Sequence, residues 1–384
     1  MSLTKDPLSL ILLPTLECNA ACEYCFEDKS KARLSHEQLA VLLNKVCAYM
    51  NKQGIAVLSI NWQGGEVMML PPDWYERAFD IIQEIGAAHR VRINHYIQTN
   101  LISYSPAWLP VLTDMFNSSL GSSLDFPNLY RKLPGSDPAG YDAIMREKIK
   151  QAQLAGLHVG VIAVPNEQTL LFGARRFYDY YVNQLKLTSF QVNTPFAGGA
   201  VSQVKLTYPL DNEQLSKFFI ELTDIWISEG YERGIQVGPF DQLLNYFLEG
   251  DQGLLCIWGE NCANEFFCID PLGNLSQCDC WAASYPDFHF GNLLEPGSLK
   301  SLLANSRVRQ RFLDRPACLM EKEECIDCPY LSLCHGGCPV RAYTMNNKLR
   351  SKDPYCATYK AIFSHVEQVA AKVAAQRSCG TQGT

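Results

Sequence analysis

Short apolar runs alternate with amphipathic stretches from residue 8 to about residue 225. The apolar runs have the length of strands and occupy 8–14, 55–62, 91–99, 118–124, 157–164 and 189–196. The other stretches have apolar positions at helical spacing and occupy 35–53, 73–88, 105–116, 141–155, 172–186 and 211–229. Ser35 and Asp211 are predicted N-caps of two of these helices. This order predicts an α/β fold with parallel strands and right-handed crossovers, and leaves open whether the units form an open sheet or a partial barrel.

The pattern stops after about residue 235. Helical spacing returns only at 240–249 and 298–313, and residues 254–356 are rich in Cys, Gly and Pro. Such a segment buries little apolar surface, so we expect bound metal to stabilise it. Residues 357–376 are predicted to form a closing helix. We therefore predict two parts, residues 1–235 and residues 236–384.

Composition narrows the classes of function. The chain has 384 residues, of which 47% are hydrophobic, enough for a sizeable core. The net charge of −7 and the lack of a basic run argue against a nucleic-acid partner. No apolar run approaches the length of a membrane span, and 8–14 lacks the basic flank and cleavage site of a signal peptide. We therefore expect a cytoplasmic protein.

The sixteen cysteines are clumped rather than spread along the chain, which favours metal binding over disulfides. Cys18, Cys22 and Cys25 form the first clump, with C-x3-C-x2-C spacing, directly after the first predicted strand. A zinc site usually needs four ligands. An iron–sulfur cluster held by three cysteines instead keeps one iron open. In a barrel, the loop would lie at the C-terminal ends of the strands, where active sites form.

The stretch "CNAACEYCF" resembles the C-x3-C-x-aromatic-C signature of radical S-adenosylmethionine (SAM) enzymes. In that family SAM binds the open iron of a 4Fe–4S cluster, and its reductive cleavage gives a 5′-deoxyadenosyl radical that abstracts hydrogen from the substrate. The resemblance implies a partial (β/α)6 TIM-like barrel, a cluster on Cys18, Cys22 and Cys25, and Tyr24 beside the adenine. A zinc loop is the alternative.

Two further motifs resemble SAM-binding segments of the family. "QGGE" at 63–66 resembles the turn that binds the SAM amino group: Gly64 and Gly65 would allow close backbone approach, and Glu66 would accept from the ammonium. "SSLD" at 122–125 resembles the family's "SLDG" and implies that Ser123 contacts the ribose.

Two more residues complete this comparison. Relatives carry an arginine for the SAM carboxylate at the place of Arg146, in the helix predicted after the fourth strand. Phe126 replaces the glycine of "SLDG", and we expect it to alter the substrate side of the site.

Residues 325–338, "CIDCPYLSLCHGGC", resemble the SPASM domain, which holds two auxiliary 4Fe–4S clusters. The resemblance, with C-x10-G-x4-C spacing upstream, implies eight ligands: Cys262, Cys268, Cys278 and Cys338 for the first cluster, and Cys325, Cys328, Cys334 and Cys356 for the second. Cys280 is a rival to Cys278. Two zinc ribbons are the alternative. The expected cofactors are therefore SAM and three 4Fe–4S clusters.

The resemblance also suggests a substrate class, because SPASM enzymes mostly oxidise peptides and proteins. We predict side-chain modification of a ribosomally made peptide, such as a crosslink. The alternatives are formylglycine formation by an anaerobic sulfatase-maturating enzyme, a small-molecule substrate, and a zinc-stabilised binding module without catalysis. Only 17 residues precede Cys18, so a peptide leader would bind the barrel itself or a separate leader-recognition protein.

Asp279 directly follows Cys278 and is the predicted catalytic base, because a carboxylate there would lie beside both a cluster and the substrate. We expect a flavodoxin- or ferredoxin-type protein to donate electrons.

Overall fold

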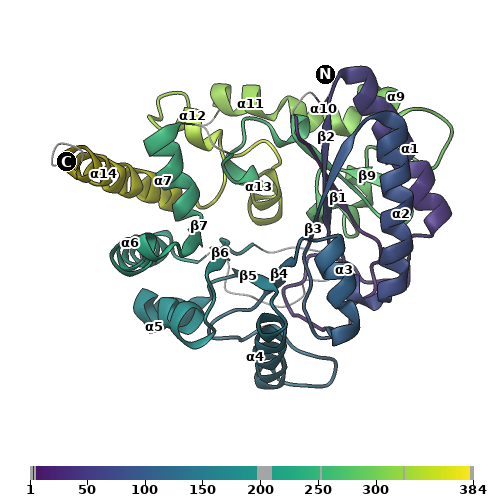
Figure 1. Cartoon of the computed structure of the whole chain (residues 1–384). Coiled ribbons are helices and arrows are strands. Elements are labelled where there is room, and N and C mark those ends of the chain that lie inside the picture. Colours follow the sequence, from purple (N-terminus) through teal and green to yellow (C-terminus); the bar gives the residue numbers. More distant parts are fainter. Residues whose placement is uncertain (1–2, 4–5, 197–209, 251–252, 323–324, 381–384) are drawn as a thin grey trace.

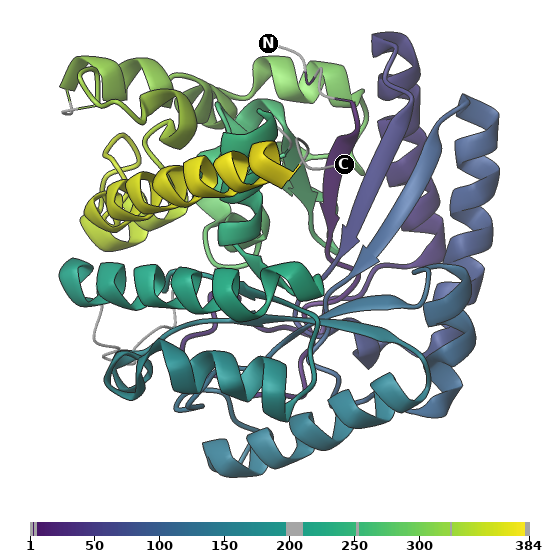
Figure 2. The same ribbon diagram turned by 60° about the vertical axis from the view of Figure 1, so that its left-hand side comes forward.

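The computed structural model describes residues 3, 6–196, 210–250, 253–322 and 325–380. The six predicted strands are present as β1 (Leu8–Leu12), β2 (Val57–Trp62), β3 (Arg92–Ile97), β4 (Ser119–Ser123), β5 (His158–Ala163) and β6 (Ser189–Val192). A seventh, β7 (Gln236–Gly238), was not predicted, because three residues are too few for a periodic signal. Neighbouring strands in this series are parallel, and a parallel bridge between Gln98 and Gly121 joins β3 to β4. The parallel α/β prediction is confirmed, and the strands follow one another in a curved, open arrangement (Figure 2).

Helices cover the outer face of these strands (Figure 1). They are α1 (His36–Gln53), α2 (Pro72–His89), α3 (Leu109–Asp114), α4 (Pro138–Leu154), α5 (Glu167–Tyr178) and α6 (Asn212–Glu229), with a π-helical turn at Asp179–Gln184. Both predicted N-caps are confirmed. The Ser35 side chain accepts from the backbone N–H of Gln38 in a capping box, and Asp211 accepts from that of Gln214. No helix among the described residues is long and apolar enough to cross a membrane.

The C-terminal part adds strands to the same sheet. β8 (Phe266–Ile269) pairs in parallel with β1, and β9 (Asn274–Ser276) and β10 (Gly291–Asn292) extend the sheet with antiparallel pairs. The sheet order is therefore β10-β9-β8-β1-β2-β3. The division of the chain at residue 235 stays a prediction.

Short helices make up most of the remaining C-terminal part. They are α7 (Phe240–Glu249), α8 (Asp279–Ala282), α9 (Leu299–Asn305), α10 (Arg307–Leu313), α11 (Arg315–Lys322), α12 (Leu331–Cys334), α13 (Pro339–Asn346) and the long α14 (Cys356–Gly380). The stretch predicted as one helix at 298–313 is two, because Ser306 is extended and caps α10. α14 packs against α6 and α7, burying Ile362, Phe363 and Val366. One continuous core thus runs from the parallel strands into the cysteine-rich part.

Candidate active site

The loop that carries the first three cysteines follows β1 and is fixed by backbone hydrogen bonds. The N–H of Ala21 donates to the carbonyl of Lys132 at 2.7 Å, and that of Glu23 to the carbonyl of Tyr130 at 2.9 Å. The three cysteines are half-buried. Burial raises the pKa of Cys18 to about 12 and that of Cys25 to about 11. These thiols would therefore ionise at neutral pH only against a bound metal, which is the behaviour expected of cluster ligands.

The two glycines of the QGGE turn lie against this loop. A Cβ on Gly64, whose φ is +141°, would lie 2.6 Å from the carbonyl oxygen of Thr15, and a Cβ on Gly65 would lie 2.3 Å from that of Glu17. The N–H of Gly65 donates to Thr15 at 3.1 Å. The close approach predicted from the sequence is thus made to the cysteine loop itself.

Glu66 joins the ends of β2 and β3. Its side chain is 2% exposed and accepts from the N–H of Met68 at 2.9 Å, the N–H of Asn100 at 2.6 Å and the hydroxyl of Thr99. Burial raises its pKa, and these donors oppose the rise. The side chain of Asn100 continues to Asn19 in the cysteine loop at 2.7 Å. Glu66 therefore holds three segments of the candidate site together, and Asn100 is a participant that no sequence motif indicated.

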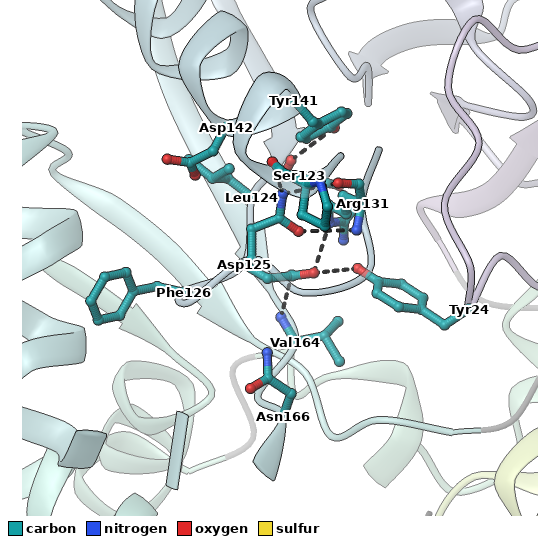
Figure 3. Close-up of polar contacts among 12 residues, drawn as sticks. Tyr24, Ser123, Leu124, Asp125, Phe126, Arg131, Tyr141, Asp142, Val164 and Asn166 are labelled. Carbon is teal, nitrogen blue, oxygen red and sulfur yellow. Dashed lines mark hydrogen bonds and ion pairs between the residues drawn. The ribbon is translucent and has the colours of Figure 1, made fainter. Parts of the chain in front are cut away.

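Tyr24 points away from its loop toward Asp125, at the end of β4 (Figure 3). Its hydroxyl donates to Oδ2 of Asp125 at 2.5 Å, and Nε of Arg131 donates to the same oxygen at 2.9 Å. The guanidinium carbon of Arg131 lies 5.2 Å from the centre of the Tyr24 ring. The N–H of Val164 on the β5 side donates to the other oxygen of Asp125 at 2.9 Å. A single buried carboxylate thus fixes the orientation of Tyr24, and Arg131 was missed because one basic residue in a loop has no characteristic spacing.

The remaining residues predicted around SAM lie in different surroundings. The Ser123 hydroxyl accepts from the side chain of Gln98 at 2.9 Å, at the C-terminal end of β4. Arg146 is exposed on α4, with its guanidinium carbon 5.7 Å from the centre of the Tyr180 ring. Phe126 stacks on Tyr180 with centroids 4.3 Å apart and points away from Tyr24 (Figure 3). Whether Phe126 alters the substrate side of the site stays a prediction.

The four cysteines predicted for the second auxiliary cluster surround one cavity. Its volume is about 380 Å³ including its open mouth, and Cys325, Cys328, Cys334 and Cys356 all line it. A single zinc ion would hold its sulfur ligands within about 4.6 Å of one another, twice the Zn–S distance. Among the described residues, the group of three possible ligands that converges within 4.8 Å is Cys278, Asp279 and Cys280. Four cysteines around one cavity match the ligand number of a four-iron cluster.

The four cysteines predicted for the first auxiliary cluster are not all grouped by the structure. Burial raises the pKa of Cys262 strongly, and the neighbouring thiols of Cys278, Cys338 and Cys256 raise it further. Cys256 and Cys262 also line a second cavity of about 310 Å³, together with the residues on either side of Cys338. Cys256 is exposed as a residue, although burial of its sulfur raises its pKa to about 12. The structure therefore groups Cys256 with three of the predicted ligands.

Cys268 has a different environment. It lies on β8, is fully buried and packs with Leu13, Leu16 and Ala282 in a small apolar cluster. Burial raises the pKa of Cys268 strongly, and the neighbouring Asp279 and Cys278 raise it further. Its inclusion among the ligands rested on its place between two cysteines in the sequence, which carries no information about its direction on the strand.

Asp279 is the first residue of α8, and burial raises its pKa to about 6. The pKa of Glu27 is raised to about 8 by burial and by the neighbouring carboxylate of Asp279. Ser284 joins the two segments, donating to the carbonyl of Phe26 at 2.6 Å and accepting from the N–H of Asp28 at 3.1 Å. The buried Glu27 and the half-buried Asp279 thus lie where the cysteine loop meets α8, an arrangement suited to accepting a proton. Glu27 was not predicted.

Comparison with known proteins identifies relatives along almost the whole chain, although no family model matches. The serine-type anaerobic sulfatase-maturating enzyme of Bacteroides thetaiotaomicron is 23% identical over 394 residues, covering 94% of this chain and 89% of the relative. The cysteine-type anaerobic sulfatase-maturating enzyme of Clostridium perfringens is 23% identical over 370 residues, covering 94% and 96%. Native anSMEcpe with bound AdoMet has a TM-score of 0.78 at 22% identity, covering 96% of this chain and 100% of that one. The chain is a homologue of the radical SAM maturating enzymes.

Two further solved structures share the fold. Native anSMEcpe with bound AdoMet and the Cp18Cys peptide has a TM-score of 0.75 at 24% identity, covering 96% of this chain and 99% of that one. Streptococcus suis SuiB bound to S-adenosylmethionine has a TM-score of 0.57 at 16% identity, covering 91% and 77%. The predicted modification of a ribosomally made peptide is wrong, because the relatives matched over 89% and 96% of their own length are named anaerobic sulfatase-maturating enzymes. The comparisons favour the alternative named with it.

Proposed function

We propose that this protein is an anaerobic sulfatase-maturating enzyme, which oxidises a Cys or Ser side chain of a sulfatase polypeptide to formylglycine. The likeness to serine-type and cysteine-type enzymes over 94% of the chain carries the proposal. The structure of anSMEcpe with a bound peptide supports a polypeptide substrate.

Three groups of cysteines hold iron–sulfur clusters in this proposal. Cys18, Cys22 and Cys25 hold the cluster that binds SAM; Cys256, Cys262, Cys278 and Cys338 hold the first auxiliary cluster; and Cys325, Cys328, Cys334 and Cys356 hold the second. Cys256 takes the place predicted for Cys268, because Cys256 lines the same cavity as Cys262, whereas Cys268 packs in an apolar cluster. When bound, SAM and its cluster supply one-electron oxidation of a substrate C–H bond.

The side chains of the chain itself bind and orient. Tyr24 lies beside the adenine, and Asp125 and Arg131 fix its ring so that little freedom is lost when SAM binds. Ser123 contacts the ribose. Glu66 keeps the QGGE turn against the cysteine loop and presents a negative field to the SAM ammonium. Arg146 has no part in this proposal, because its guanidinium packs on Tyr180.

Asp279 is the proposed base. It lies at the start of α8, where that helix meets the cysteine loop, so its carboxylate would lie between the SAM cluster and the first auxiliary cluster. It would take the proton of the substrate thiol or hydroxyl, while the first auxiliary cluster would accept the second electron. A Ser substrate would then have a C=O bond, and a Cys substrate a C=S bond that water converts into the aldehyde with release of sulfide. Glu27 lies beside Asp279, and its raised pKa would keep it protonated at neutral pH, so that the two carboxyl groups carry one negative charge between them.

The test uses two synthetic peptides with a sulfatase maturation sequence, one with Cys and one with Ser at the target position. The anaerobically reconstituted enzyme is incubated with SAM and a strong reductant, and aldehyde is trapped with a hydrazine reagent and located by mass spectrometry. We expect aldehyde in at least one peptide and none with the Cys18→Ala/Cys22→Ala/Cys25→Ala variant. Cleavage of SAM by the wild type without aldehyde in either peptide would overturn the proposal.

A further inference from the structure

One glutamine side chain crosses the boundary between the two sheets of the structure. β3 is the last strand of one sheet and β4 the first strand of the other, and the parallel bridge between Gln98 and Gly121 joins them. At this bridge the N–H of Thr99 donates to the carbonyl of Gly121 at 3.0 Å. Nε2 of Gln98 extends the junction along β4 by donating to the carbonyl of Ser122 at 2.8 Å. The side-chain amide thus does what a backbone N–H does between paired strands.

Gly121 provides the space for this side chain. A Cβ on Gly121 would lie 2.1 Å from Oε1 of Gln98 and 3.2 Å from its amide carbon. Any other residue at position 121 would therefore displace the amide of Gln98. A glycine inside a strand often marks such a close approach, and here it allows the amide to lie against β4.

The hydrogen bonds show which atom of the amide faces β4. The carbonyl of Ser122 can only accept, so the nitrogen of Gln98 faces it and the oxygen does not. The second hydrogen of the same nitrogen is directed at the hydroxyl oxygen of Ser123, which lies 2.9 Å away. Both donors of the amide are therefore used, one to fix its place and one on the hydroxyl of Ser123.

The hydroxyl of Ser123 is left with one hydrogen to donate. Ser123 is half-buried at the C-terminal end of β4, whereas Ser122, its neighbour on the opposite face of the strand, is fully buried. Within the described ranges of the chain, no group accepts the hydrogen of the Ser123 hydroxyl. Because Gln98 already donates to the oxygen, that hydrogen points away from Gln98 and can serve a ligand.

We propose, as a step that rests on the proposed function, that Gln98 is a positioning residue for SAM and makes Ser123 a hydrogen-bond donor to a hydroxyl oxygen of the ribose. A serine hydroxyl without a fixed partner rotates and can either donate or accept. The amide of Gln98 is held by Ser122 and packed on Gly121, so it fixes the role of Ser123 before SAM arrives. Less freedom is then lost on binding. Gln98 itself touches no ligand.

The experiment compares the binding of SAM and of its 2′-deoxy and 3′-deoxy analogues to the anaerobically reconstituted enzyme by calorimetry. We expect the wild type to bind SAM about three- to tenfold more tightly than one of the two analogues, which is the usual worth of one neutral hydrogen bond. Gln98→Met keeps the length of the side chain but donates nothing, and the preference should fall below about twofold. Ser123→Ala should lose the preference too. The double variant should bind SAM as tightly as Ser123→Ala alone, because Gln98 acts through that hydroxyl.

Gln191→Met is the matched control. Gln191 on β6 is paired with Gly238 on β7, where a Cβ would lie 2.0 Å from its Oε1, but its Nε2 donates to the carbonyl of Val192 at 3.3 Å. This glutamine therefore packs on a glycine of the next strand as Gln98 does, without holding a serine hydroxyl. We expect the melting temperature to change about as much as in Gln98→Met, and the preference for SAM over the analogue to stay that of the wild type.

The pattern of affinities separates the possible outcomes. A wild-type preference in Gln98→Met, or additive losses of SAM affinity in the double variant, would overturn the inference and leave Gln98 as a structural link between two sheets. If Gln98→Met does not fold, Gly121→Ala displaces the amide without removing it and should show the same loss; an unchanged preference there would equally overturn the inference. A wild type that binds SAM and both analogues equally would overturn it as well, whereas a wild type that binds no SAM would contradict the proposed function itself.

Discussion

Replacing Cys256 and Cys268 in turn by Ala tests which of them holds the first auxiliary cluster. Three four-iron clusters bind about twelve irons per chain. Cys256→Ala removes one of four proposed ligands, so we expect the loss of about four irons, a third of the total. Ala is the informative substitution, because a serine oxygen can still coordinate iron.

Cys268→Ala is the matched control, because the same atom is removed from a cysteine with a different environment. The Cys268 side chain is fully buried against Leu13, Leu16 and Ala282. Deleting one buried heavy atom from such a cluster costs about 1 kcal/mol in folding free energy, through lost packing and a small residual cavity. We therefore expect a modestly lower melting temperature and an unchanged iron content.

Both variants are reconstituted under anaerobic conditions, and iron and sulfide per chain are measured beside the melting temperature. The reduced proteins are then compared by electron paramagnetic resonance, which should lose one cluster signal in Cys256→Ala alone. The reasoning is refuted if Cys268→Ala loses a third of the iron while Cys256→Ala keeps it. That result would restore the ligand set expected from sequence spacing.

Three further changes test other parts of the site and fold. Glu66→Gln turns an amide N–H toward the N–H of Asn100. We therefore expect the folding stability to fall by about 1–3 kcal/mol and SAM binding, measured by calorimetry, to weaken about tenfold. Unchanged stability and unchanged SAM affinity would contradict the role given to Glu66. Asp279→Asn should lower formylglycine yield about 10²-fold while deuterium still passes from labelled substrate into 5′-deoxyadenosine, and a wild-type yield would show that another group is the base. Burial lowers the pKa of His95 from 6.5 to about 4, and its Nδ1 accepts from the indole of Trp62 at 3.1 Å. As pH falls from about 6.5 toward 4, only the unfolded state gains this proton, so about 2 kcal/mol of folding stability is lost at pH 5. His95→Asn keeps a hydrogen-bond acceptor but does not titrate. Urea unfolding at pH 7 and pH 5 should therefore show this loss in the wild type and not in the variant.

Features set by nearby residues were predictable from the sequence, and those set by distant contacts were not. The caps at Ser35 and Asp211 depend on residues within one turn, and they were predicted correctly. The grouping of Cys325, Cys328, Cys334 and Cys356 was expected from the resemblance to the SPASM domain, and these four cysteines line one cavity. By contrast, Glu27 and Asp279 are far apart in the sequence, and only the packing of the cysteine loop against α8 brings their carboxyl groups together. Close backbone approach at Gly64 and Gly65 was predicted from the QGGE motif, but the motif does not show that the neighbouring backbone is that of Thr15 and Glu17.

The pairing of β8 with β1 has a consequence for dividing this protein. β1 is an interior strand, with β2 on one side and β8 on the other, and Leu10 and Leu12 on it are opposite Phe267 and Ile269. A fragment that ends at residue 235 would leave one side of β1 with unpaired backbone N–H and carbonyl groups, next to apolar side chains. Such an edge recruits strands from other molecules, so the fragment should aggregate rather than act as a small SAM-cleaving enzyme. During synthesis, β1 can therefore pair on both sides only after about two thirds of the polypeptide has been made.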